Sequence, residues 1–557
     1  MSGAERRWAW LVALLLSVAL SLPYLLAWAQ TPRDAAFMGS VWNPDDPCVY
    51  LSWMRQAADG RFLFAALFTT EPGADSTLYT NPLFLALGGM ARLTGLSLPV
   101  AYALARFVFG AWLLYLVYAT TALFTPRQAV RRGALWLAGT SSGLGWLYRA
   151  LDLAGGAGLP KLQCVDIAYV GGSRDAIGLA MPELNTALSV MLLPLFSASM
   201  CLMLVALGQA WRAVLGGSTP RAVWAGVALL LLGSIHTYDV IPVALTLVAF
   251  GVLAVRADLA RARAVARVLL TIALLGAPAV VYVAALLKAD PIFRSRSPAM
   301  ASPSALSYAV SLGIPLLLAM VGAVHVVRRR RRELYPLLAW AAFSCGVAFL
   351  PGVTFQRKLI EGAHIPVCIL SAVAVTHAIA PWFARRRRLR PSSLRQSVRT
   401  VSLLAIAVCL PSTLVFVQRA QLTWGDNNLS RGLPPYYMPL DDLRAMDWLR
   451  DHTARGSVVL ASPLSGAYIP GISGNRVVAG HFADTLSYGD KLGEMAGFYR
   501  ARDVAARAGF LRRYRVRYLL YGTMEHGLPG SPDVWLSGIP SAVVFRQGGA
   551  AVYEIGL

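Results

Sequence analysis

The sequence predicts a helical protein that crosses a membrane many times and carries a small α/β domain at its C-terminal end. Hydrophobic residues make up 57% of the 557 residues, only 14% are charged, and the mean hydropathy is +0.55. Soluble domains do not have this composition. Apolar runs long enough to cross a bilayer recur up to residue 418, and the composition changes after about residue 435. These observations together predict a polytopic membrane protein.

About eleven segments have the length and hydropathy of a membrane span. They are residues 8–30, 98–124, 133–150, 185–209, 222–237, 240–255, 267–288, 304–327, 335–351, 366–384 and 399–418. A further apolar stretch, 81–95, is short and interrupted by two glycines, so we expect a helix lying at the membrane interface. The first span resembles a signal peptide around Ala27, but its apolar core is long for one, so we expect a retained anchor.

The basic clusters predict which side of the membrane each connection occupies. They all fall in alternate connections: Arg6 and Arg7, 127–132, Arg212 and Arg221, 256–267, 328–332 and 385–399. The positive-inside rule places these connections in the cytoplasm. The chain then belongs in the plasma (inner) membrane, with its N-terminus cytoplasmic and everything after about residue 419 extracytoplasmic. Because this sorting explains most of the net charge of +23, nucleic acid is not an expected partner.

We expect two domains. Residues 1–430 form the membrane domain, which includes a long first outer loop at 31–97, and residues 431–557 form an extracytoplasmic α/β domain. The second domain shows helical patterns at 438–452, 487–499 and 502–514, and strand patterns at 458–462, 476–480, 517–522, 542–546 and 551–555. The Gly-, Ser- and Pro-rich stretch 462–476, and His481, Asp484 and Asp490 after it, predict a loop-rich surface. Turn chemistry explains that surface as well as acceptor binding does.

Two of the six cysteines, Cys48 and Cys164, lie in predicted outer loops, where a disulfide between them is compatible with the sequence. The other four lie within spans and are expected to be buried apolar residues. No pair has the spacing of a zinc site or a CxxC redox motif.

Two adjacent carboxylates follow the first span. Asp45, Asp46 and Pro47 predict a helix start, with an acid at the cap and proline in the first turn. Tyr50 follows on the next turn. The acids have an alternative role, because a carboxylate at a helix start caps it and stabilises its dipole. One cap needs one acid, however, and this chain has two.

This loop resembles the first outer loop of the GT-C glycosyltransferases. The shared features are a first span, an acid pair, an aromatic residue one turn later, Gly60, and an interfacial helix that opens with Asn-Pro-Leu at 81–83. The superfamily includes protein mannosyltransferases, lipid A aminoarabinose transferases and arabinofuranosyltransferases, which use polyprenyl-phosphate sugars. The resemblance implies that Asp45 is the catalytic base. The second acid of the family pair is often Glu, where this chain has Asp46.

A second polar cluster, in the stretch 354–366, lies in the last short outer loop. Arg357, Lys358, Glu361 and His364 fall within two helical turns, and cations held on the outer side indicate an anionic ligand. The alternative is an ion pair between Arg357 and Glu361.

Three other ionisable residues interrupt apolar sequence. Glu183 precedes the fourth span, and His236 and Asp239 lie in the turn between the fifth and sixth. Such residues are functional by default in membranes. Glu183 is also compatible with a helix-terminal charge, and His236 with a packing residue.

The sequence therefore predicts an inverting membrane glycosyltransferase. Asp45, aided by Asp46, takes a proton from the acceptor, and Arg357 and Lys358 meet the leaving phosphate. Its partners are a polyprenyl-phosphate sugar donor, membrane lipids and a glycan, lipid or protein acceptor. Two adjacent acids are compatible with a divalent metal ion and with its absence. The alternatives are a transporter or flippase of a lipid-linked saccharide, which usually shows internal repeats, and a non-catalytic envelope assembly protein.

Overall fold

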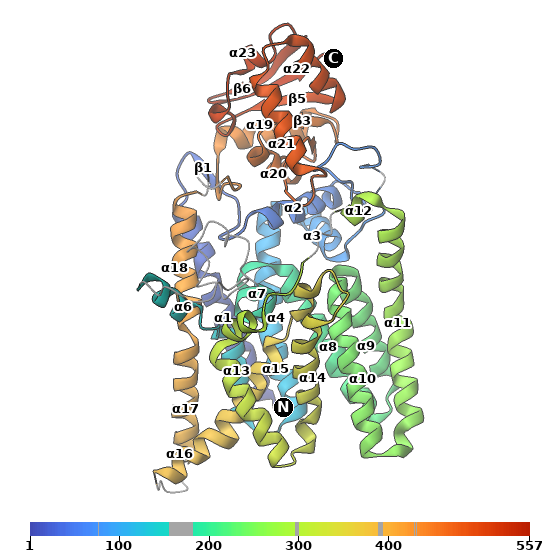
Figure 1. Ribbon diagram of the computed structural model, residues 1–557, viewed down its shortest axis with the longest axis vertical. Coiled ribbons are helices and arrows are strands. Elements are labelled where there is room, and N and C mark those ends of the chain that lie inside the picture. The colour runs from blue at the N-terminus through green and yellow to red at the C-terminus, as the bar shows by residue number, and fades with distance from the viewer. Residues whose placement is uncertain (76, 155–181, 296–299, 388–393, 428, 430–431) are drawn as a thin grey trace. The chain divides into compact units, whose positions relative to one another are not determined.

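The computed structural model describes residues 1–75, 77–154, 182–295, 300–387, 394–427, 429 and 432–557 (Figure 1). The chain forms two compact units. The first contains residues 1–22, 105–282 and 299–419 where these are described, and the second contains residues 23–104, 283–298 and 420–557. Each unit is described in turn.

Eight helices in the described residues are long and apolar enough to cross a membrane. They are α1 (Gly3–Ala29), α4 (Leu98–Phe124), α8 (Pro194–Gly216), α10 with the turn before it (Thr237–Ala257), α11 with the turn before it (Leu259–Ala289), α13 (Ala305–Arg328), the helix through α15 and α16 (Gln356–Arg386), and the helix through α17 and α18 (Arg395–Leu422). The chain is a multi-pass membrane protein, as the sequence predicted.

Three of the expected spans are shorter in the structure. The segment 133–150 divides into α5 (Gln128–Thr140) and α6 (Gly145–Leu153). The helix breaks at Gly143, where an added Cβ would lie only 2.3 Å from the carbonyl oxygen of Val310, so this position requires glycine. The other two are α9 (Thr219–Ile235) and α14 (Tyr335–Gly346). The number of spans therefore stays a prediction.

The first unit is a helical bundle around α15 (His364–Ala374). Every residue of α15 is buried, as expected of a helix that is apolar on all sides. Helices α13 and α5 pack against it, and α8 packs against both α9 and α10.

The second unit contains a five-stranded sheet with the order β4-β3-β5-β7-β6. Strands β3 (Val458–Leu460), β4 (Arg476–Val477) and β5 (Val516–Tyr521) are parallel, whereas β7 (Ala550–Ile555) runs antiparallel to both β5 and β6 (Ser541–Gln547). All five lie where the sequence predicted strands.

Side chains alternate between the two faces of this sheet, as the pleat requires. Val459, Leu520 and Val552 belong to a core shared with α19 (Leu440–His452) and α20 (Pro463–Ile472). Leu460 and Leu519 belong to the opposite core, shared with α21 (Tyr488–Arg500), α22 (Val504–Arg513) and α23 (Pro532–Trp535). The domain is therefore a three-layer α/β/α structure.

The first loop, residues 31–97, packs onto this domain. Strand β1 (Ala35–Phe37) pairs with β2 (Tyr437–Pro439), and α2 (Asp45–Ala58) packs against α20. Helix α3 (Pro82–Thr94) crosses α2 at Gly88, where a Cβ would lie 2.3 Å from the Met54 carbonyl oxygen. The sequence gives no sign that the loop and the C-terminal domain share a core, and the predicted boundary near residue 430 stays a prediction.

The stretch 462–476 is not the loop-rich surface that its composition suggested. It contains the buried helix α20, which Ser462 caps and in which Pro463 occupies the first turn. Small residues let this helix lie close to its neighbours, so Gly and Ser here serve packing and do not form turns.

Candidate functional site

The two predicted carboxylates occupy the first turn of α2. The cap residue is Pro44, which has no capping side chain, and the helix begins at Asp45. The sequence predicted an acid at the cap and Pro47 as the first helical residue, so the predicted helix start is wrong by one to two residues. Asp46 accepts a hydrogen bond from the amide of Asn43 at 3.2 Å. Asp45 makes no hydrogen bond within the described chain. Neither acid is used as a side-chain cap, although both lie in the first turn, where a carboxylate interacts favourably with the helix dipole.

A buried histidine from the C-terminal domain faces these acids. Nδ1 of His481 lies 3.3 and 3.2 Å from the backbone nitrogens of Ala483 and Asp484 and 3.2 Å from the Asp484 carboxylate. Its Nε2 makes no hydrogen bond among the described residues and lies 3.9 Å from Oδ1 of Asp46. Burial lowers the pKa of His481, but the hydrogen bond and charge of Asp484, with the charges of Asp46 and Asp45, outweigh burial and raise it.

The pKa of Asp45 is also raised. Burial is the largest cause, the charge of His481 opposes it, and the neighbouring charge of Asp46 adds to it. The charges of His481 and Asp46 therefore act on the pKa of Asp45 in opposite directions.

Tyr50 follows the acids on α2 and joins an aromatic cluster. Its ring stacks on Phe84 of α3, with centroids 4.8 Å apart, and lies 5.6 Å from Trp53. Trp53 in turn contacts Phe64 and Tyr79. This cluster fixes α2 against the rest of the loop, which holds the turn that carries the acids in place.

In the first unit, the structure joins Glu183 to the predicted cations. Glu183 lies in a 3₁₀ turn (Pro182–Leu184), and Arg357 and Lys358 lie in the 3₁₀ helix η8 (Gln356–Ile360). Nζ of Lys358 is 2.8 Å from Oε1 of Glu183, and Arg357 is 3.8 Å from the same oxygen. Burial raises the pKa of Glu183, but these two cations more than offset it and hold that pKa at about 2.

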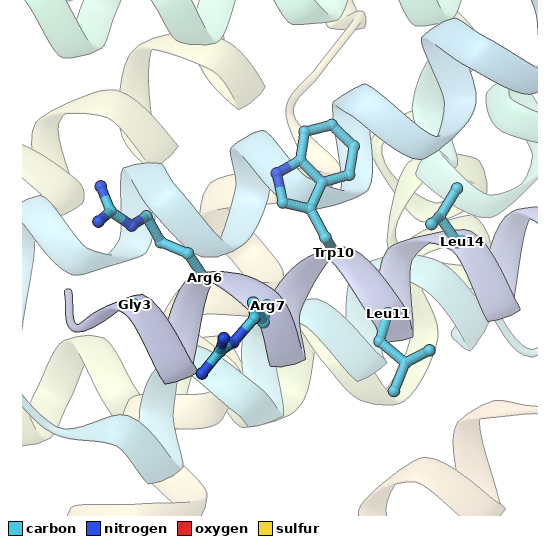
Figure 2. A pocket seen from close by; sticks show the side chains of 6 residues that line it. All are labelled: Gly3, Arg6, Arg7, Trp10, Leu11 and Leu14. Atoms are coloured by element: carbon cyan, nitrogen blue, oxygen red, sulfur yellow. The ribbon is translucent and has the colours of Figure 1, made fainter.

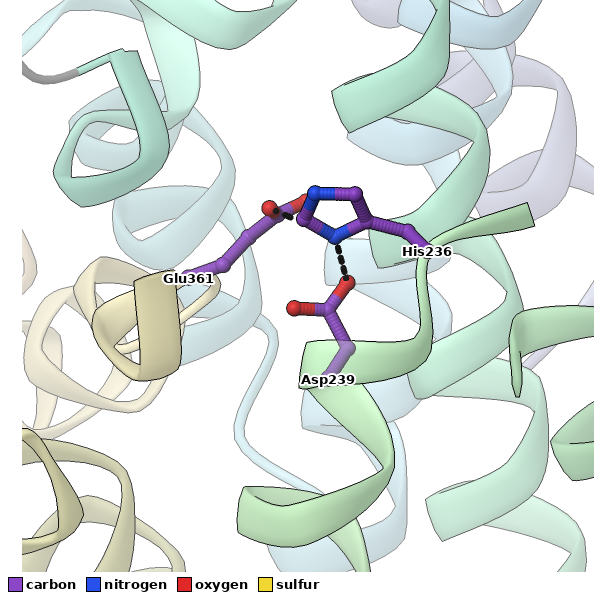
Figure 3. A group of neighbouring side chains, drawn as sticks. All are labelled: His236, Asp239 and Glu361. Atoms are coloured by element: carbon purple, nitrogen blue, oxygen red, sulfur yellow. Dashed lines mark hydrogen bonds and ion pairs between the residues drawn. The ribbon is translucent and has the colours of Figure 1, made fainter. Parts of the chain in front are cut away.

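Glu361 belongs to a different cluster from Arg357. Its Oε2 lies 3.3 Å from Nδ1 of His236, and its Oε1 accepts a hydrogen bond from Ser199. Nδ1 of His236 is also 2.9 Å from Oδ2 of Asp239 (Figure 3). The three side chains therefore converge, in an arrangement that is able to hold a metal ion. The pair Arg357–Glu361 that the sequence offered as an alternative is replaced by these contacts.

His364 is separate from both groups. Its Nε2 lies 3.2 Å from the Ser141 hydroxyl, and its Nδ1 lies 3.0 Å from the Thr186 hydroxyl. The side chain is buried and joins α15 to α5 and α7 (Thr186–Leu192). In this structure its contacts are those of a packing residue.

A hollow of about 590 Å³ lies along the N-terminal half of α1 (Figure 2). Its lining residues are Gly3, Arg6, Arg7, Trp10, Leu11 and Leu14. The two arginines lie at one end and apolar side chains cover the rest (Figure 2). None of the residues predicted for the site lines it, and we assign it no function.

The sequence did not identify the role of two contributing residues. Ser199 lies inside a span and resembles any other small helical residue. His481 was noticed but explained by turn chemistry, and only its burial beside Asp46 distinguishes it. No local signal identifies either residue, because their partners are distant in the sequence.

Comparison with known proteins identifies solved structures that share the fold of this chain. No family model matches the chain, and no curated protein does. The structure of the oligosaccharyltransferase from Archaeoglobus fulgidus in its apo form matches with a TM-score of 0.55 and 14% identity, over 93% of this chain and 69% of that chain. The chain therefore shares the fold of this archaeal enzyme. This agrees with the fold that the resemblance in the first loop implied.

Two further solved structures match the chain. The same archaeal enzyme tethered to an acceptor peptide with the NVT sequon gives a TM-score of 0.52 at 13% identity, over 94% of this chain and 69% of that one. The arabinofuranosyltransferase AftD from mycobacteria gives 0.48 at 15% identity, over 99% of this chain and 40% of that one. At 13–14% identity, the likeness to the archaeal enzyme extends to the fold, and most individual residues differ.

Proposed function

We propose that the protein is an inverting membrane glycosyltransferase. It transfers a sugar from a polyprenyl-phosphate-linked donor to a glycan, lipid or protein acceptor on the outer face of the plasma membrane. The observation that carries the proposal is the pair Asp45 and Asp46, which occupies the first turn of α2 without capping it, in a chain with a GT-C fold. Asp45 is assigned as the general base, and Asp46 and His481 set its protonation.

The pKa of Asp45 supports this assignment. A base works best when its pKa approaches the working pH while it remains ionised. Burial and the charge of Asp46 raise the pKa of Asp45, and the charge of His481 limits the rise. The ionised carboxylate takes the proton of the acceptor hydroxyl as the oxygen attacks the anomeric carbon from the side opposite the phosphate, which inverts that carbon.

The leaving group gains charge during the reaction. When the bond between the anomeric carbon and the phosphate oxygen breaks, the electron pair stays on that oxygen, and a phosphodiester with one negative charge becomes a phosphomonoester that approaches two. Arg357 and Lys358 are assigned to this phosphate. Glu183 supplies one negative charge against their two positive charges and fixes their positions. Cations that are positioned in advance stabilise developing charge better than mobile ones do.

The acceptor belongs to one of three classes: glycan, lipid or protein. The archaeal oligosaccharyltransferase was solved with an acceptor peptide, which supports a polypeptide as the first acceptor to test. Tyr50 is assigned to the surroundings of the acid pair, and Glu183, His236, Asp239 and Glu361 to those of Arg357 and Lys358. The sequence also offered His364 for substrate binding, and we assign it a supporting role because it is buried against Ser141 and Thr186.

The test is to incubate purified protein with radiolabelled polyprenyl-phosphate sugars and a membrane extract. A glycosyltransferase releases free polyprenyl phosphate in proportion to the sugar that becomes acceptor-linked. A flippase moves the intact labelled lipid across a vesicle membrane without releasing it, and an assembly protein leaves it unchanged. Either of the last two results contradicts the proposal.

A further inference from the structure

We infer that His236, Asp239 and Glu361 bind one divalent transition-metal cation, such as Mn²⁺ or Zn²⁺. This inference goes beyond the proposed function, because no step of sugar transfer described above uses the ion. The ligand atoms come from three elements of the first unit: the C-terminal end of α9, the 3₁₀ turn Thr237–Asp239, and the residue that follows η8. Figure 3 shows the imidazole lying between the two carboxylates.

The spacing of the ligand atoms fits a metal. One potential ligand atom from each residue lies within 4.8 Å of the other two. Nδ1 of His236 is 2.9 Å from Asp239 and 3.3 Å from Glu361. Neighbouring ligands in an octahedron with bonds of about 2.1 Å are separated by about 3.0 Å. Small side-chain rotations therefore suffice to place all three ligands around one ion.

Unpaired buried oxygens provide a second, independent indication. Asp239 and Glu361 are both fully buried. Oδ1 of Asp239 makes no hydrogen bond among the described residues. Oε2 of Glu361 makes none there either, and the His236 nitrogen that lies 3.3 Å from it is closer to Asp239, at 2.9 Å. A buried carboxylate oxygen without a donor is costly, and a cation removes that cost for both residues at once.

Charge favours a divalent ion. When both carboxylates act as ligands they bring two negative charges, and one divalent cation neutralises both of them.

The donor set indicates which ion binds. One imidazole nitrogen with two carboxylates suits Mn²⁺, Fe²⁺ or Zn²⁺, whereas Mg²⁺ and Ca²⁺ prefer oxygen ligands alone. Ser199 donates a hydrogen bond to the second oxygen of Glu361 and orients this ligand, as partners outside a metal's first shell commonly do.

The experiment uses the purified full-length protein in detergent. After treatment with a chelator and removal of the chelator, the protein is titrated with Mn²⁺, and binding is followed by electron paramagnetic resonance. We expect one bound ion per chain, an increase in the unfolding temperature on binding, and competition by Zn²⁺. Asp239→Asn and Glu361→Gln are each expected to weaken binding by about 100-fold or more, because each removes a charged ligand.

The control is Asp258→Asn. Asp258 contacts Arg261 with the same i,i+3 spacing as His236 and Asp239, but its carboxylate is exposed, so this variant should bind Mn²⁺ like the wild type. Because the decisive measurement is on the wild-type chain, it does not depend on the variants folding. The inference is overturned if the wild type binds no ion and gains no thermal stability from Mn²⁺ or Zn²⁺. It is also overturned if Asp239→Asn and Glu361→Gln fold and still bind as the wild type does.

Discussion

Replacing Glu183 by Gln tests the ion-pair group that holds Arg357 and Lys358. The variant keeps the shape of the side chain and removes its charge. In the native chain the two cations hold the pKa of Glu183 at about 2, against an ordinary value of 4.5. A difference of this size corresponds to roughly 3 kcal/mol of stability at neutral pH. The Glu183 side chain is 1% exposed, so solvent screening does not reduce this value much.

The sign of the pH dependence follows from the lowered pKa. The stabilisation is fully present above the ordinary pKa of a glutamate and is lost as the pH falls through the folded value of about 2. Unfolding of both proteins is followed in detergent by denaturant titration at pH 7 and pH 3. The difference in the free energy of unfolding should be roughly 3 kcal/mol at pH 7 and smaller at pH 3.

The matched control for this variant is Glu333→Gln. Glu333 pairs with Arg331, but both side chains are about half exposed, so its loss should cost less than about 1 kcal/mol. Equal unfolding of Glu183→Gln and the wild type at pH 7 would refute the reasoning, because the buried ion pairs would then contribute nothing.

Three other predictions concern the proposed chemistry and topology. Transfer needs ionised Asp45, so a pH–rate profile of the wild type should rise with pH through the pKa of Asp45. His481→Gln should move this rise to higher pH, because the charge of His481 lowers the pKa of Asp45. Asp46→Asn should move it to lower pH, because the charge of Asp46 raises that pKa. Lys358→Ala should lower kcat/KM for the donor by an amount equivalent to about 1.5–3 kcal/mol, without loss of folded protein. The control Lys288→Ala, at an exposed position, should leave kcat/KM unchanged. Full turnover in Lys358→Ala would exclude a phosphate contact. Cysteine introduced at the exposed position Ser541 should react with a membrane-impermeant thiol reagent added outside the cell. Cysteine introduced at Arg330 should react only after the cells are permeabilised. The reverse pattern would overturn the predicted orientation.

Local patterns in the sequence predicted most of the secondary structure. The strands of the C-terminal domain were found because short runs rich in β-branched, aromatic and other apolar residues form them, and each belongs to a sheet that buries both faces. Helix α20 was missed because its Gly, Ser and Pro residues favour turns locally. Only tertiary packing makes such residues favourable in a buried helix, and packing is not visible in a window of ten residues.

The candidate site was predicted in parts and not as an arrangement. Arg357 and Glu361 are four residues apart, so a local pattern pairs them, but the carboxylate that Lys358 contacts belongs to Glu183, 175 residues earlier. His236 and Asp239 were singled out as a polar turn, and nothing in their neighbourhood pointed to Glu361. Contacts between distant segments depend on how the helices pack, which a single sequence does not encode in any short motif.

The initial rate of sugar transfer by Asp45→Asn tests the central claim most directly. Asparagine keeps the size and polarity of the side chain but does not accept a proton at neutral pH. At saturating polyprenyl-phosphate sugar, and normalised to monodisperse protein in detergent, we expect a rate lower than the wild type by roughly 10²–10⁴-fold, with a smaller loss in Asp46→Asn. Wild-type transfer by a folded Asp45→Asn protein would contradict the assignment of Asp45 as the base, and wild-type transfer by both variants would contradict a catalytic role for the acid pair.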